Sequence, residues 1–105
     1  MKIYLIKQVD SNLYKIGLTR GKVNNRLKQL QTGNGTELKI ISEFKTNYNH
    51  KFESALHCFF NHRRKIGEWF ELTNNDVLFF KNVCDILEKN LKILSEQNTW
   101  IQNNQ

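Results

Sequence analysis

The chain contains no proline, and its 105 residues include only five glycines, two cysteines and one methionine. Because no stretch is rich in proline or glycine, no linker divides the sequence, and we expect one domain over residues 1–105. No apolar run exceeds four residues, which excludes a helix that spans a membrane. The N-terminus also lacks the layout of a signal peptide, so we expect a cytoplasmic protein without a membrane partner.

The two cysteines are Cys58 and Cys84, and each lies among apolar residues at helical spacing. Neither has a second ligand beside it, so the pair suits neither a disulfide framework nor a zinc site. We therefore expect two buried, reduced thiols.

Charge is distributed unevenly along the chain. Residues 1–72 carry thirteen Lys and Arg against six Asp and Glu, a net charge of +7. The remaining 33 residues carry three against four, a net charge of −1. A basic surface of this kind suits a polyanionic partner, although on charge alone it suits a merely solubilising surface equally well.

Short segments rich in aromatic and β-branched residues, at 2–8 and 13–19, predict a β-hairpin. The alternation over residues 38–45 predicts a third strand, and a further extended segment is expected at 69–72.

Apolar residues at helical spacing predict three helices, over residues 23–31, 49–63 and about 74–97. Thr73 and Asp76 form a capping box that begins the third helix. The second helix is expected to bury Phe52, Ala55, Leu56, Phe59 and Phe60. The third is expected to bury Val77, Phe80, Val83, Cys84, Leu87, Leu91 and Leu94. The order β-β-α-β-α-β-α predicts the α/β (α+β) class, with a small antiparallel sheet flanked by helices.

Two tripeptides, Lys2-Ile3-Tyr4 and Lys15-Ile16-Gly17, lie on the two strands of the predicted hairpin with ten residues between them. Arg26 follows on the first predicted helix, and Glu53 follows on the second. This ordered set resembles the motif of the GIY-YIG nuclease superfamily, with lysine in place of the first glycine and of the second tyrosine. The resemblance extends over residues 2–72.

Further strings, RLKQLQTG at 26–33, Glu53 with His57, and GEWF at 67–70, are similar to the small stand-alone branch found in phage and viral proteins. In that branch lysine commonly replaces the second tyrosine. The resemblance implies hydrolysis of DNA phosphodiester bonds to a 5′-phosphate and a 3′-hydroxyl, with Mg²⁺ (or Mn²⁺) as cofactor. A viral protein would act in the cytoplasm of its host cell.

The resemblance implies that Tyr4 is the general base that activates water. A free phenol is a poor base near neutral pH, since its ordinary pKa is about 10. A hairpin register that places Lys15 across from Tyr4 would set an ammonium beside the phenol and favour the phenolate. Lys15 would then tune Tyr4 or contact a phosphate, and the sequence leaves open which of the two is the base. A core tyrosine with a solvated strand lysine is the alternative.

For Arg26 the resemblance implies stabilisation of the transition state, because a guanidinium matches a pair of phosphoryl oxygens. Glu53 is implied as the metal ligand, since Mg²⁺ prefers carboxylate and water oxygens. His57 lies four residues later on the same helix face and is expected to support the site or contact a phosphate. Judged by residue type alone, Arg26 could equally be a solvent-facing helix arginine, and Glu53 with His57 could be a surface pair without a catalytic role.

Other residues have less specific roles. Tyr14 is expected to pack or to support the wall of the active site, while Trp69 and Phe70 are expected in the core. Nucleic-acid contacts are expected at the basic residues Lys22, Lys28, Arg63, Arg64 and Lys65.

The sequence therefore predicts a metal-dependent endonuclease with low intrinsic sequence specificity, because no appended DNA-binding domain fits into the residues after Leu72. One alternative is a catalytically weak nucleic-acid-binding module on the same scaffold. Another is a viral protein-interaction module that uses the C-terminal helix, whose signature is an exposed apolar face over residues 77–94. DNA is the expected partner, RNA is not excluded, and strandedness and oligomeric state stay open.

Overall fold

The computed structural model describes residues 1–103, with side chains described through residue 97. Its centre is a five-stranded antiparallel sheet in the order β3-β1-β2-β5-β4. The strands are β1 (Lys2–Gln8), β2 (Leu13–Thr19), β3 (Leu38–Lys45), β4 (Arg64–Ile66) and β5 (Trp69–Glu71). The hairpin, the third strand and the segment at 69–72 are confirmed. The sequence did not predict β4, because all three of its residues are exposed and show no alternation.

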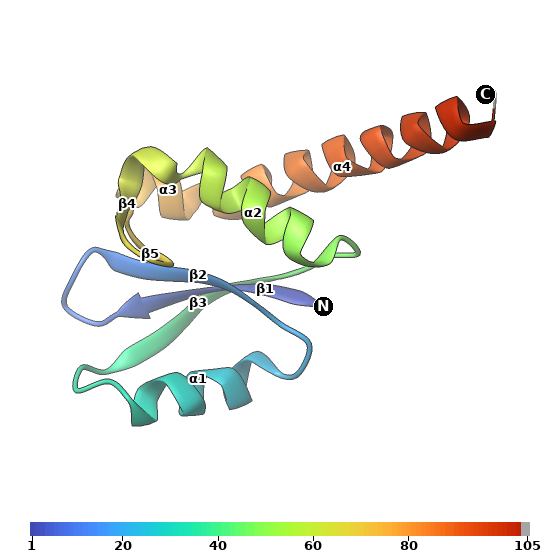
Figure 1. The fold of residues 1–105 in the computed structure, drawn as a ribbon. Helices are drawn as coiled ribbons and strands as arrows, with labels where there is room; N and C mark the ends of the chain where they lie inside the picture. The colour runs from blue at the N-terminus through green and yellow to red at the C-terminus, as the bar shows by residue number, and fades with distance from the viewer. Residues whose placement is uncertain (104–105) are drawn as a thin grey trace.

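Helices cover both faces of the sheet, as Figure 1 shows: α1 packs on one side, and α2 and α4 pack on the other. Their bounds are α1 (Val23–Thr32), α2 (Asn49–Phe59), the 3₁₀ turn η1 (Asn61–Arg63), α3 (Asn74–Leu78) and α4 (Phe80–Asn103). The α+β class, with an antiparallel sheet flanked by helices, is confirmed.

Two predicted helices differ from the observed ones. The helix expected over 49–63 ends at Phe59, because the chain turns through η1 and comes back as β4 to pair with β5. The helix expected over 74–97 begins at the capping box of Thr73 and Asp76 as predicted. It is interrupted at Phe79, and its second part, α4, continues beyond Gln97.

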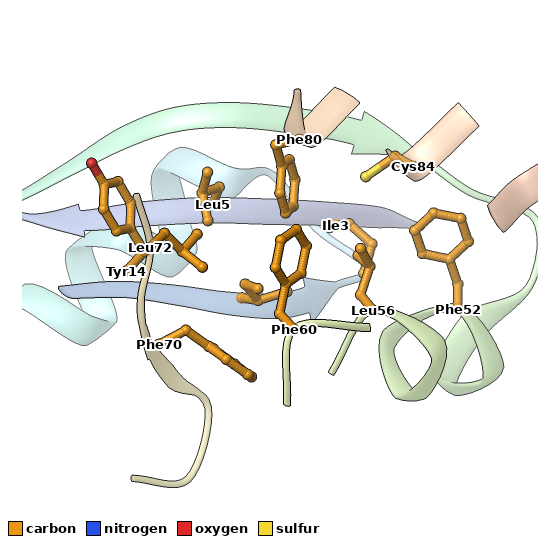
Figure 2. Close-up of a cluster of buried hydrophobic side chains, with 11 residues drawn as sticks. Ile3, Leu5, Tyr14, Phe52, Leu56, Phe60, Phe70, Leu72, Phe80 and Cys84 are labelled. Atoms are coloured by element: carbon orange, nitrogen blue, oxygen red, sulfur yellow. The ribbon is translucent and has the colours of Figure 1, made fainter. Parts of the chain in front are cut away.

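The alternation of β1 divides the core into two clusters. Ile3 and Leu5 point toward α2 and α4, whereas Tyr4 and Ile6 point toward α1. Figure 2 shows the larger cluster, in which side chains of β1 and β2 meet those of α2, β5 and α4. Tyr4 is thereby placed in the smaller cluster beneath α1, together with Val23.

Four predicted core positions are corrected. Phe52 and Leu56 on α2 and Phe60 just after it are buried, so Cys58 and Phe59 face outward. Cys58 is therefore exposed, and Phe59 is 51% exposed. Ala55 is likewise only partly buried. Leu94 is 54% exposed because the outer part of α4 extends past the sheet, as Figure 1 shows.

Candidate active site

Tyr4 and Arg26 meet on the face of the sheet that α1 covers. Val23 anchors the start of α1 in the core, and Arg26, one turn later, is carried over β1. Arg26 Nε donates a hydrogen bond of 3.4 Å to the hydroxyl of Tyr4. This hydrogen bond is the largest cause that raises the pKa of Arg26, and the negative charge of Glu68 adds a smaller effect. The guanidinium therefore stays charged beside a buried phenol oxygen.

Gly17 lies directly under the ring of Tyr4. The two residues are cross-strand partners in the β1–β2 ladder. A Cβ atom on Gly17 would overlap the Tyr4 hydroxyl and the ring carbon that bears it. The glycine of the second tripeptide is therefore required by packing, because any side chain there would displace the phenol.

The observed register differs by two residues from the one that would place Lys15 across from Tyr4. Tyr4 faces Gly17, and Lys15 faces Ile6. The register follows from the turn, in which the hydroxyl of Ser11 donates to the carbonyl of Gln8 at 2.7 Å. A shift of two residues keeps the side chains on the same face, so Lys15 is still a diagonal neighbour of Tyr4.

Lys15 is held by residues that follow β4. Its ammonium lies 3.0 Å from a carboxylate oxygen of Glu68 and 5.6 Å from the centre of the Trp69 ring. Only 13% of the Lys15 side chain is exposed. Glu68 was not predicted from the sequence. It follows Gly67, whose φ of 55° forms the tight turn that brings Glu68 to β2.

His57 fixes the middle of β2 from the other face. Its Nε2 lies 2.8 Å from the carbonyl oxygen of Ile16, so this ring nitrogen carries the proton and donates. The ring also lies 5.3 Å from that of Phe70. On its other side Ile16 donates its N–H to the carbonyl of Glu68 at 3.1 Å. Lys15, Ile16 and Gly17 are thus each anchored by a different contact.

Glu53 lies one helical turn before His57, and its side chain is 17% exposed. Nδ1 of His50 lies 3.7 Å from one of its carboxylate oxygens. α2 packs against β2, where His57 contacts Ile16, and Figure 1 shows this helix on the face of the sheet opposite α1. Tyr4 and Arg26 therefore lie on one face of the sheet, and α2, which carries Glu53 and His57, lies on the other.

Glu53 has the chemistry of a magnesium ligand. Among the described residues, no group of three or more His, Cys, Asp and Glu is placed to hold a metal ion. Mg²⁺ commonly keeps several waters and uses one or two carboxylates together with substrate phosphates. A single carboxylate that is partly exposed satisfies that requirement.

Three of the predicted nucleic-acid contacts are engaged within the protein. Arg63 Nε lies 3.2 Å from Asp76 and Lys65 Nζ lies 3.2 Å from Glu71. Arg64 donates to the carbonyl of Gly67. The other two predicted contacts, Lys22 and Lys28, are exposed at the start and in the middle of α1.

Tyr14 lies on the face opposite Tyr4, in the larger core cluster, where Lys7 Nζ is 5.8 Å from its ring centre. Phe70 is buried in the same cluster, and Trp69 packs against the smaller one, as predicted.

Two surface hollows occur elsewhere on the described part of the chain. One of about 460 Å³ is lined by Lys7, Val9, Asp10, Ser11, Lys39 and Ile41. The other, of about 290 Å³, is lined by Asn47, Tyr48, Asn49, His50 and Lys51 at the start of α2. Neither includes Tyr4 or Arg26, so the predicted catalytic residues do not line either hollow.

The T5orf172 domain family matches residues 1–85, a range that contains every predicted site residue. No curated protein and no solved structure matches the chain. None of the helices within residues 1–103 is long and apolar enough to cross a membrane.

Proposed function

Because the chain belongs to the T5orf172 domain family, we propose that it is an endonuclease of GIY-YIG type that hydrolyses DNA phosphodiester bonds. The observation that carries this proposal is the hydrogen bond from Arg26 to Tyr4, made directly above Gly17. Three residues that the motif sets in order along the sequence thus share one small volume. The residue order and the contact support the same chemistry from independent directions.

Tyr4 is the proposed general base. Its hydroxyl lies beside the guanidinium of Arg26, and a fixed positive charge stabilises negative charge on a neighbouring oxygen. Lys15 supplies a second cation from a diagonal position on the same face. A phenolate in this place takes a proton from the attacking water.

Arg26 is the proposed stabiliser of the transition state. Its Nε is engaged with Tyr4 and its Nη1 donates to Gln29 at 3.2 Å. A guanidinium has five N–H donors, so others stay available for phosphoryl oxygens. Preorganised charge of this kind is usually the largest contribution to hydrolysis of a phosphodiester.

Glu53 is the proposed ligand of Mg²⁺ (or Mn²⁺). A bound Mg²⁺ supplies positive charge to the phosphoryl oxygens and orients the phosphate. His57, whose Nε2 is engaged with Ile16, keeps α2 and thus Glu53 at a fixed position along β2. His57 is therefore proposed as a positioning residue for Glu53.

Low sequence specificity is part of the proposal. The predicted nucleic-acid contacts are made by Lys and Arg side chains, which bind phosphates without reading the bases. Residues 1–72, with a net charge of +7, attract any nucleic acid. The test is incubation of the purified chain with labelled single- and double-stranded DNA and RNA, with Mg²⁺ or with EDTA. Cleavage of DNA that requires the metal supports the proposal, and no cleavage of any substrate contradicts it.

A second candidate function is protein binding through the C-terminal helices. The exposed apolar face that marks this alternative is present, in Leu78, Phe79, Ile86, Ile93 and Leu94. Sedimentation of the full chain and of an Ile86→Lys/Ile93→Lys variant tests the simplest case, self-association. A concentration-dependent mass that the variant lacks supports a binding role, and two monomeric proteins argue against self-association.

A further inference from the structure

Glu68 contacts β2 twice, at neighbouring residues. Its main-chain carbonyl accepts the N–H of Ile16 at 3.1 Å, and its carboxylate lies 3.0 Å from the ammonium of Lys15. The tight turn at Gly67 and the pairing of β5 with β2 bring it there. Its position is therefore fixed by the backbone, independently of its side chain.

The carboxylate of Glu68 also acts on the second cation of this face. Its charge contributes to the raised pKa of Arg26, after the larger effect of Tyr4. Glu68 is thus paired with Lys15 and acts more weakly on Arg26. A phosphate that contacts these two cations meets a carboxylate already there.

We propose that Glu68 is a positioning residue for Lys15 and the resting counter-ion of the phosphate-binding face, an inference that rests on the proposed function. The carboxylate holds the ammonium against Trp69, at a diagonal to Tyr4. It thereby keeps Lys15 in place for the reaction. It also repels the substrate phosphate and weakens the binding of nucleic acid in the ground state.

The two roles have opposite effects: holding Lys15 favours cleavage, whereas repelling the phosphate weakens binding. A merely structural contribution of Glu68 would not change the two quantities in opposite directions. Replacing Glu68 by Gln removes the charge and keeps the size and the main-chain bond to Ile16. Binding of DNA should tighten, because one repelling charge is gone, and the cleavage rate of bound DNA should fall, because Lys15 is released. Since 40% of the Glu68 side chain is exposed, we expect changes of about two- to fivefold in each quantity.

The experiment compares Glu68→Gln with Glu71→Gln in the full chain. Glu71 is a matched control, because it carries the same charge, is 46% exposed and pairs with Lys65 at 3.2 Å on the next strand. Affinity for a labelled DNA duplex is measured in EDTA, and single-turnover cleavage is measured in Mg²⁺. Glu68→Gln should show tighter binding with slower cleavage, and Glu71→Gln should show a smaller gain in affinity with unchanged cleavage.

The Lys15→Ala background decides whether Glu68 acts through Lys15. The loss of cleavage caused by Glu68→Gln should disappear there, as coupled residues require. An equal loss in both backgrounds, or equal effects of Glu68→Gln and Glu71→Gln, overturns the inference. A chain that binds DNA without cleaving it contradicts the proposed function, and the EDTA affinities then decide on the counter-ion role. A chain that neither binds nor cleaves DNA overturns both the proposed function and the inference about Glu68.

Discussion

Gly17 supports the phenol of Tyr4 from below, across the β1–β2 ladder, so closely that a methyl group on its Cα would overlap the hydroxyl. The contact explains why a glycine is needed at this point of β2. It also fixes the distance between the Tyr4 hydroxyl and α1, from which Arg26 donates a hydrogen bond to that hydroxyl. The two tripeptides recognised in the sequence thus form one packing unit.

Gly17→Ala should impair cleavage more than it impairs folding. The new methyl group forces Tyr4 away from Arg26, and over-packing of this kind costs about 1–3 kcal/mol of unfolding free energy. Activity and thermal melting are measured in parallel. Gly35→Ala is the control, because a Cβ there meets nothing within 4 Å. Wild-type cleavage by Gly17→Ala would show that the position of Tyr4 is unimportant.

The elements that carry the site were accessible from the sequence, because the patterns of the hairpin and of α1 are local. That Tyr4 and Arg26 share one face was not, since Ile3–Ile6 are all buried and only the packing of α1 distinguishes the two faces. The register that pairs Tyr4 with Gly17 was not accessible either, since it depends on the Ser11 turn. Glu68 was missed for a similar reason: it reaches Lys15 only through the return of β4 and β5, and β4 has no sequence pattern.

Tyr4→Phe should abolish cleavage and leave the fold intact. The ring is buried and keeps its packing, whereas the hydrogen bond with Arg26 and the proton acceptor are lost. The expected loss of stability is about 1 kcal/mol, typical of one hydrogen bond. Denaturant unfolding and a cleavage assay on the same preparation measure both. Cleavage by Tyr4→Phe close to the wild-type rate would remove the phenol from the mechanism.

Lys15 variants distinguish a tuning cation from a base. If Lys15 assists Tyr4, Lys15→Ala lowers the rate, and Lys15→Arg retains part of the activity because it keeps a cation. If instead Lys15→Ala is inactive while Tyr4→Phe cleaves well, the two roles must be exchanged. Full activity in all three variants would make the hairpin purely structural.

The two cysteines should differ in reactivity. Cys58 is exposed and should react with a thiol reagent in the native protein, whereas Cys84 should react only after unfolding. Burial, with smaller contributions from Asp85 and Glu88, raises the pKa of Cys84 to about 12 from 9.0. Because the pKa of this thiol is higher in the folded protein than in the unfolded one, the neutral thiol contributes fully to the free energy of unfolding below about pH 9. That contribution is lost as the pH rises toward 12. Equal labelling of both thiols would contradict this placement.

Affinity for nucleic acid should fall steeply with salt. The basic region neutralises phosphates without reading bases, so the logarithm of the binding constant should decrease linearly with the logarithm of salt concentration. Arg63, Arg64 and Lys65 already have partners in the protein, so removing Lys22 and Lys28 should reduce the slope more than removing those three. A flat salt dependence would favour the protein-binding role of the C-terminal helices.

The most direct test of the nuclease assignment is the cleavage of labelled DNA in Mg²⁺ by the wild-type chain, Arg26→Ala and Glu53→Ala, each shown to be folded by circular dichroism. We expect the wild-type protein to cleave and EDTA to stop the cleavage. Each variant should lose about 100-fold or more in rate, because Arg26 stabilises the transition state and Glu53 holds the metal. Cleavage by either variant at nearly the wild-type rate, or cleavage that persists in EDTA, would contradict the nuclease assignment.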